Sequence, residues 1–127
     1  MTTSFTIVIS PKEAIFRGQL KFRLPQPIEL IGDWEVGLTT LSCAPAEETP
    51  HAWIFCDLVE YTYVVDGSAQ FLDVMSTTEV KNGNPHYARV IKHRFSDINI
   101  EIKTSCKGNI YIETDKDVVC ILHFQKA

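Results

Sequence analysis

The sequence lacks the long apolar runs, basic runs and short motifs that mark many functional classes. No apolar stretch approaches the ~18 residues of a membrane span, and lysine and arginine never form a run longer than two residues. Neither a membrane segment nor a nucleic-acid-binding surface is therefore expected. There is no Gly-x-Ser-x-Gly elbow, glycine-rich phosphate loop or Asn-x-Ser/Thr sequon. The first residues lack the charged and apolar regions of a signal peptide, and none is expected.

Closely spaced cysteine pairs are also missing. The four cysteines, Cys43, Cys56, Cys106 and Cys120, all lie in or beside apolar segments, and none belongs to a Cys-x-x-Cys pair. Zinc sites usually take their ligands from such pairs on turns. We therefore expect buried free thiols in a reducing, intracellular compartment, and neither a metal nor a cofactor.

The composition that remains is that of an ordinary globular protein. The chain has 127 residues, of which 45% are hydrophobic and 22% charged, and its formal net charge is −4. This length is sufficient to bury a core, and the hydrophobic content is too high for a disordered chain. No internal repeat or low-complexity tract is visible, so residues 1–127 are expected to form one domain.

Apolar residues recur with a period of two. In the clearest example, Ile98, Ile100 and Ile102 alternate with polar residues, which predicts a half-buried strand. The last strand carries apolar residues at consecutive positions and is expected to be buried on both faces. No helical period extends over three turns. Strands are expected over about 4–10, 19–24, 27–31, 34–42, 52–59, 61–65, 69–75, 86–95, 98–105, 109–114 and 118–125.

Turn-forming residues such as Gly32-Asp33 separate these strands. Many short strands without helical crossovers predict an all-β protein, an antiparallel two-sheet sandwich of about eight to ten strands. This pattern alone leaves jelly-roll and immunoglobulin-like topologies open. Pro25 and Pro27 cannot donate to a ladder, so their segment is expected to be an edge strand or a kink.

No set of residues has the spacing of a catalytic site, and we expect no enzymatic activity. Cys56 and Asp57 are neighbours on an expected strand and should face opposite sides, so they cannot act together. A buried aspartate needs hydrogen-bonding partners. Asp57 is therefore expected to be structural, capping a turn or pairing with an arginine.

Two segments, 44–51 and 76–85, have the composition of exposed loops. Trp53 follows the first of them; core packing is the preferred interpretation, and partial exposure at a partner interface is the alternative. Trp34 is expected in the core. The candidate partner-contact residues in and beside these loops are Glu47, Glu48, His51, Trp53, Asn82 and Asn84.

The segment Leu24–Leu38 resembles a leucine-proline, then Gly-x-Trp-Glu-Val-Gly-Leu motif of capsid-associated proteins from Polinton/Maverick-type elements and adintoviruses. Trp53–Glu60 is similar to the family's aromatic-x-x-Cys-Asp-apolar-apolar-Glu strand. Further matches follow in order at residues 64–67, 71–72, 95–102 and 122–124, so the resemblance covers most of residues 20–125. The turn at residues 65–67 departs from the family pattern. The matching residues include Gly32, Trp34, Glu35, Val36, Gly37, Leu38, Cys56 and Asp57.

The resemblance implies a single jelly roll and a self-assembling, penton-like minor capsid protein of a viral or transposon-derived element. It implies structural motif residues, no cofactor, and as partners further copies of the chain, a pentamer being one candidate, and a major capsid protein. The implied location is the virion, with the host-cell cytoplasm or nucleus during assembly. A non-enzymatic β-sandwich that binds protein or glycan through its end loops is the alternative.

Overall fold

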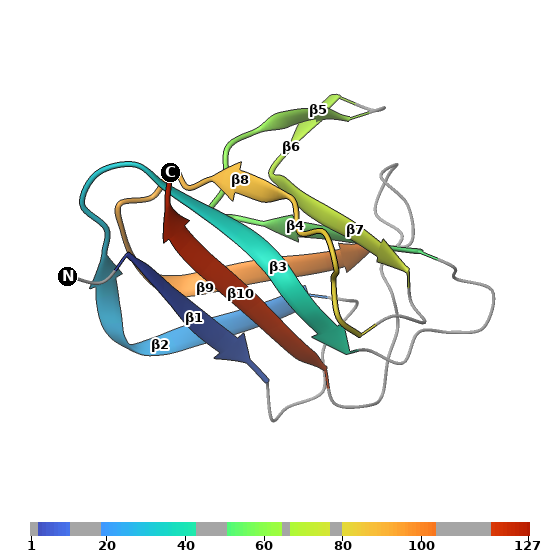
Figure 1. Ribbon diagram of the computed structural model, residues 1–127, viewed down its shortest axis with the longest axis horizontal. Helices are drawn as coiled ribbons and strands as arrows, with labels where there is room; N and C mark the ends of the chain where they lie inside the picture. The colour runs from blue at the N-terminus through green and yellow to red at the C-terminus, as the bar shows by residue number, and fades with distance from the viewer. Residues whose placement is uncertain (1–2, 11–18, 43–50, 65–66, 77–79, 104–117) are drawn as a thin grey trace.

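Ten strands are found in the part of the chain that the computed structural model describes, residues 3–10, 19–42, 51–64, 67–76, 80–103 and 118–127. Two four-stranded sheets face each other and a short hairpin lies outside both (Figure 1). The strands are β1 (Ser4–Ile9), β2 (Gln19–Glu29), β3 (Trp34–Ser42), β4 (His51–Cys56), β5 (Thr62–Val64), β6 (Gly67–Ala69), β7 (Phe71–Ser76), β8 (Tyr87–Arg89), β9 (Arg94–Lys103) and β10 (Val119–Lys126).

The strands pair in the order of a jelly roll. The first sheet has the order β1-β10-β3-β8 and the second β2-β9-β4-β7. Strands β1, β2, β3 and β4 pair antiparallel with β10, β9, β8 and β7 respectively, so the first half of the chain runs back along the second half. Wound into two sheets, such a long hairpin gives the paired Greek keys of a jelly roll. The predicted all-β, two-sheet sandwich is confirmed.

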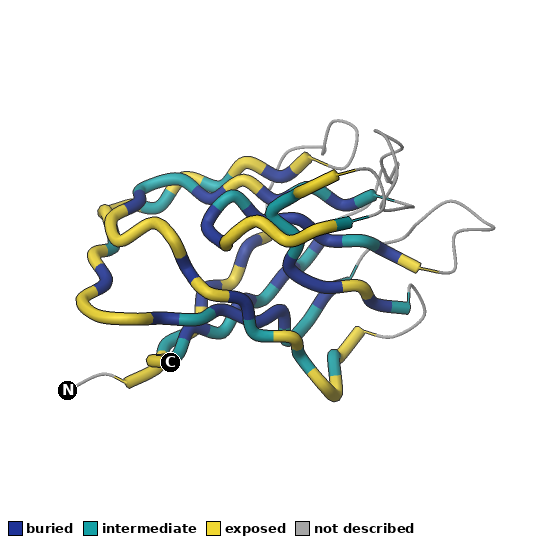
Figure 2. The backbone as a smooth tube through the Cα atoms, turned by 90° about the horizontal axis from the view of Figure 1, so that it is seen from above, coloured by how far each residue is buried: buried dark blue, intermediate teal, exposed yellow. Residues whose placement is uncertain are grey.

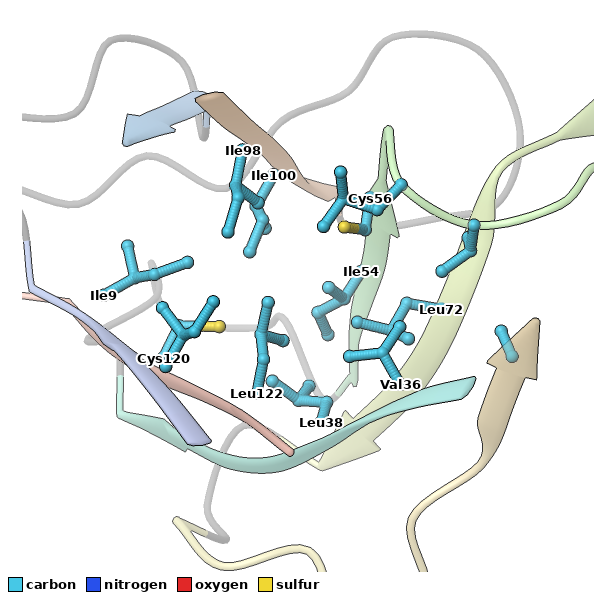
Figure 3. Packing of buried hydrophobic residues seen from close by; sticks show 14 of the residues in the cluster. Ile9, Val36, Leu38, Ile54, Cys56, Leu72, Ile98, Ile100, Cys120 and Leu122 are labelled. Carbon is cyan, nitrogen blue, oxygen red and sulfur yellow. The ribbon is translucent and has the colours of Figure 1, made fainter. Parts of the chain in front are cut away.

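The core lies between the sheets and is made of alternate residues of their strands. Figure 3 shows Ile54 and Ile98 of the second sheet facing Leu38 and Leu122 of the first. All four side chains are fully buried, and each such burial stabilises the fold by ~1.5–3 kcal/mol. Along most strands these buried residues alternate with residues that point outward and are half-buried or exposed (Figure 2).

Several predicted strand boundaries are wrong, for identifiable reasons. Residues 19–29 form one strand instead of two, and the register shift between Arg23 and Ile28 absorbs Pro25 and Pro27. This strand is at the edge of its sheet, as the prolines predict. The predicted strand 86–95 is divided, because the chain crosses from one sheet to the other between β8 and β9. The predicted strand 109–114 lies outside the described residues.

The prediction that the last strand is buried on both faces is also wrong. Cys120, Leu122 and Phe124 of β10 are buried in the core, whereas Ile121 and His123 are half-buried on the outer face of the first sheet. Strand β10 lies between β1 and β3, so neighbouring strands flank its outward side chains without covering them.

Gly37 allows an aromatic ring to lie flat on the outer face of the first sheet. It pairs with His123 on one side and Tyr87 on the other. The Tyr87 ring crosses Gly37, and its hydroxyl hydrogen bonds with His123 Nδ1 at 2.8 Å. A Cβ at position 37 would lie 2.9 Å from Cε1 of Tyr87, closer than packed carbon atoms approach. The glycine is therefore required by this contact.

We expect Gly37→Ala to lower the free energy of unfolding by ~1–3 kcal/mol, because the new methyl group displaces the Tyr87 ring. In a Tyr87→Ala background the same change should be neutral or stabilising by up to ~1 kcal/mol, since alanine suits a strand better than glycine does. Urea unfolding of the four proteins measures both values. An equal cost in both backgrounds would contradict this assignment of Gly37.

Candidate functional site

The segment Leu24–Leu38, which carries the first match to the family, covers the second half of β2, the turn after it and the first half of β3. Gly32 has a φ of +88°, which favours glycine, and places the turn that leads into β3. Trp34, Val36 and Leu38 then point into the core and are at most 6% exposed. The Trp34 Nε1–H group donates a hydrogen bond to the carbonyl oxygen of Ile31 at 3.0 Å. These residues therefore anchor β3, and the predicted core position of Trp34 is confirmed.

The outward residues of the same segment also make structural contacts. The Glu35 carboxylate accepts a hydrogen bond of 2.7 Å from Gln125 Nε2 on β10. Two positions further along β3, Gly37 lies beneath the bridge between Tyr87 and His123. The first contact joins β3 to β10, and the second joins β8 to β10 across β3 on the outer face of the sheet. The matching residues of this segment thus build the first sheet.

Cys56 belongs to the core and not to a reactive surface. Its side chain is 1% exposed, and this burial, the largest cause, raises the pKa of the thiol from 9.0 to about 12. The thiol is therefore protonated at neutral pH, whereas a nucleophilic cysteine needs the thiolate. Cys56 is free and buried, as predicted, and Cys120 is also buried in the core, whereas Cys43 and Cys106 lie outside the described residues.

Asp57, directly after β4, ties this strand to its neighbour β9. Its carboxylate accepts hydrogen bonds from the backbone N–H and the side-chain Nδ2 of Asn99, at 3.0 and 2.9 Å. Lys92 Nζ lies 3.2 Å from Asp57 Oδ2, the oxygen that also accepts from Asn99 Nδ2. The partners of Asp57 are thus a lysine and an asparagine, and not the arginine that the sequence analysis offered as one possibility. These contacts hold the end of β4 against β9.

Asp73 is the one charged residue that is buried among those the structure describes, and the sequence patterns did not single it out. Its carboxylate accepts hydrogen bonds from Val74 N at 2.8 Å, Asn82 Nδ2 at 2.8 Å and His86 N at 3.0 Å. Asn82 Nδ2 also donates to the carbonyl oxygen of Leu38 at 2.9 Å. Because Leu38 is on β3 and Asp73 is on β7, Asn82 joins the two sheets at one edge of the sandwich.

The preferred core position of Trp53 is wrong. Ala52 and Ile54 occupy the inward positions of β4, so Trp53 lies half-buried on the outer face of the second sheet. Its ring packs against Phe71 with centroids 5.8 Å apart, and Phe71 contacts Phe55 at the same separation. This arrangement corresponds to the alternative, a partly exposed aromatic residue.

The other predicted contact residues are not gathered into one site. His51 is exposed at the start of β4, and Asn84 is exposed in the segment between β7 and β8. The Asn82 side chain is engaged in the bridge between the sheets. Glu47 and Glu48 lie outside the described residues.

Among the residues that the structure describes, the most exposed aromatic side chains lie in and beside the β5–β6 hairpin. Tyr61 is 65% exposed and Tyr63 is 93% exposed. The predicted strand 61–65 contains both tyrosines, and alternation places them on one face. This face meets solvent because the hairpin belongs to neither large sheet. The alternation in the sequence could not show that.

We expect Asp73→Ala to lower the free energy of unfolding by ~2 kcal/mol, because the part-buried donors of Asn82 and His86 lose their acceptor. The matched control is Asp33→Ala, which removes an exposed ion pair with Arg89 and should cost less than ~1 kcal/mol. Chemical denaturation measures both changes. Similar losses for the two variants would show that the Asp73 bridge does not stabilise the fold.

The raised pKa of Cys56 predicts a stability loss at alkaline pH. The unfolded thiol ionises near 9.0 and the folded one near about 12, so the unfolded state releases its proton first. The contribution of Cys56 is therefore complete below pH 9.0 and declines as pH rises toward 12. Unfolding free energies across this range should fall more steeply for the parent than for Cys56→Ala. Parallel curves would contradict the burial of the thiol.

Comparisons with known proteins do not add a relative. No family model matches the chain, and neither the curated proteins nor the solved structures that were searched contain a match. Within the described ranges, no three histidine, cysteine, aspartate or glutamate residues are grouped so that they could hold a metal ion. That part of the chain also has no helix long and apolar enough to cross a membrane.

Proposed function

We propose that the chain is a self-assembling structural protein, a penton-like minor capsid component of a viral or transposon-derived element. The observation that supports this most is the jelly-roll pairing order of the two sheets. Jelly rolls are frequent in viral capsids, although they also occur in lectins and cupins. The segment Leu24–Leu38, which resembles capsid-associated proteins, leads from β2 into β3, a central strand of the first sheet.

The geometry of the sandwich suits side-by-side assembly. Strands β1 and β2 form one edge of the two sheets, and β8 and β7 form the other. A ring of copies requires two different surfaces on one subunit, each facing the other surface on a neighbour. The two edges of this chain supply different residues and are held rigidly by the common core.

The proposed partners are further copies of the chain, with a pentamer as the expected ring, and a major capsid protein. The proposed location is the virion, preceded by assembly in the cytoplasm or nucleus of the host cell. In this role the motif residues serve the fold, which agrees with their contacts in and around β3.

A protein-binding module is the second candidate, and one observation favours it. Tyr63 is 93% exposed on a hairpin outside both sheets, and tyrosine is enriched among the residues that dominate protein interfaces. In this case the hairpin would contact another protein, and the chain itself would remain a monomer.

Size-exclusion chromatography with light scattering, over a range of protein concentrations, tests the proposal. The chain has a mass of 14.4 kDa, and we expect a discrete closed oligomer, a pentamer, whose mass does not grow further with concentration. A protein that stays at the monomer mass at every concentration would contradict self-assembly and favour the binding module.

A further inference from the structure

The hairpin formed by β5 and β6 has the properties of a projecting contact element. It is inserted between β4 and β7, pairs only with itself and stands away from the sandwich beyond β7 and β8 (Figure 1). Its base is fixed, because Glu60 N donates to the carbonyl oxygen of Arg89 at 2.9 Å. We call Tyr61 together with β5 and β6 the tyrosine hairpin.

A groove of about 270 Å³ lies near the opposite edge of the sandwich. Phe5 on β1 and Ile28 on β2 line it together with Trp34, and Ile31, which is 79% exposed, stands at its rim. We call this hollow the end groove. Glu29 and Lys126 add one negative and one positive group to its lining.

The two surfaces belong to opposite edges of the same subunit. The end groove takes residues from the edge strands β1 and β2. The tyrosine hairpin follows β4, leads into the edge strand β7, and its base lies beside the other edge strand, β8. When one surface of a subunit fits another surface on its far side, copies join head to tail and close into a ring if the rotation permits.

We propose that Tyr63 of one copy inserts into the end groove of the next copy. This inference rests on the proposed function, because it identifies the contact by which the chain would assemble. The partner is therefore a second copy of this chain, and the contact joins two different surfaces.

The end groove has the size and chemistry to accept a tyrosine ring. An apolar cavity of about 150 Å³ is enough to bind benzene, and the end groove is larger than this at about 270 Å³. An inserted ring would pack against Phe5 and Trp34, while Glu29 could accept a hydrogen bond from the phenol hydroxyl. Burial of the exposed Tyr63 and Ile31 side chains would remove apolar surface from water.

Charge also favours this pairing. Glu60 lies at the base of the tyrosine hairpin and Lys126 lines the end groove. Both are exposed, and neither forms an ion pair with any other residue in the ranges the structure describes. Opposite charges on the two surfaces favour the head-to-tail arrangement over contact between two identical hairpins.

Two surface variants and their mixture test the contact. Tyr63→Asp damages the tyrosine hairpin and leaves the end groove intact, whereas Ile31→Asp does the reverse. Both positions are exposed, so each variant should keep the β-sheet circular dichroism spectrum of the parent and a cooperative unfolding transition. Val80→Asp is the matched control, because Val80 is 50% exposed but lies in neither surface.

We expect the parent and the Val80 control to be oligomers, and each of the other variants alone to have the monomer mass in light scattering. A one-to-one mixture of these two variants should form a dimer and nothing larger, since only one intact hairpin and one intact groove can meet. An adjacent Tyr63 ring should also protect the groove rim from hydrogen exchange in that dimer.

The remaining outcomes overturn the inference in distinguishable ways. If the parent is an oligomer and either variant remains one, the chain assembles through other surfaces and only this inference fails. If both variants are monomers and their mixture does not dimerise, the contact does not join hairpin to groove. If the parent is a monomer throughout, the proposed function and the inference fail together, and the hairpin is free for a different protein.

Discussion

The pairing of the first half of the chain with the second half is the constraint on which the rest of the structure depends. Ile9 pairs with Cys120 and Leu20 with Ile100, so these ladders must close long loops before they gain any stability. Only burial can offset that cost, and burial requires one face of each strand to be apolar. A register slip by one residue would turn that face to solvent, so the alternation in β3, β9 and β10 also fixes the pairing.

Burial between two sheets leaves open sides, and polar contacts close one of them. At the edge formed by β7 and β8, the Asp73 carboxylate binds Asn82, which also binds the backbone of β3 in the opposite sheet. On the second sheet, Asp57 fixes the end of β4 to β9 through Asn99. Both carboxylates accept backbone N–H groups, so their charge is compensated where it is partly removed from water. Asp73 thus closes one edge of the sandwich, and Asp57 fixes the end of a strand.

The sequence predicted those strands in which only one face is apolar. Ile98, Ile100 and Ile102 alternate with polar residues, and they face the core as expected. Around Trp53 the alternation carries less information, because Ala52, Ile54 and Cys56 are also apolar and either set could face inward. The larger aromatic residues are in fact outside. Period alone cannot choose between two apolar faces; the pairing of β4 between β7 and β9 makes that choice.

Features that depend on residues far apart in the chain were not predictable in this way. The bridge from Asp73 through Asn82 to Leu38 joins three segments, and nothing near Asp73 in the sequence distinguishes it from an exposed loop carboxylate. Gly37 was part of a recognisable motif, yet its reason lies in Tyr87, fifty positions later. The exposure of Tyr63 follows from the hairpin lying outside both sheets, which local alternation does not reveal.

The position of the tyrosine hairpin would separate the proposed assembly contact from folding. It lies at the turn of the long β-hairpin that forms the jelly roll, between β4 and β7, so its side chains can change without altering the core (Figure 1). The end groove is different, because Trp34 in its wall is also a core residue. A contact between them would join a hairpin whose side chains can change to a groove whose shape is fixed by the fold. In such a head-to-tail contact, the angle between the hairpin and the end groove of one subunit decides whether copies close into a ring and how many copies the ring holds.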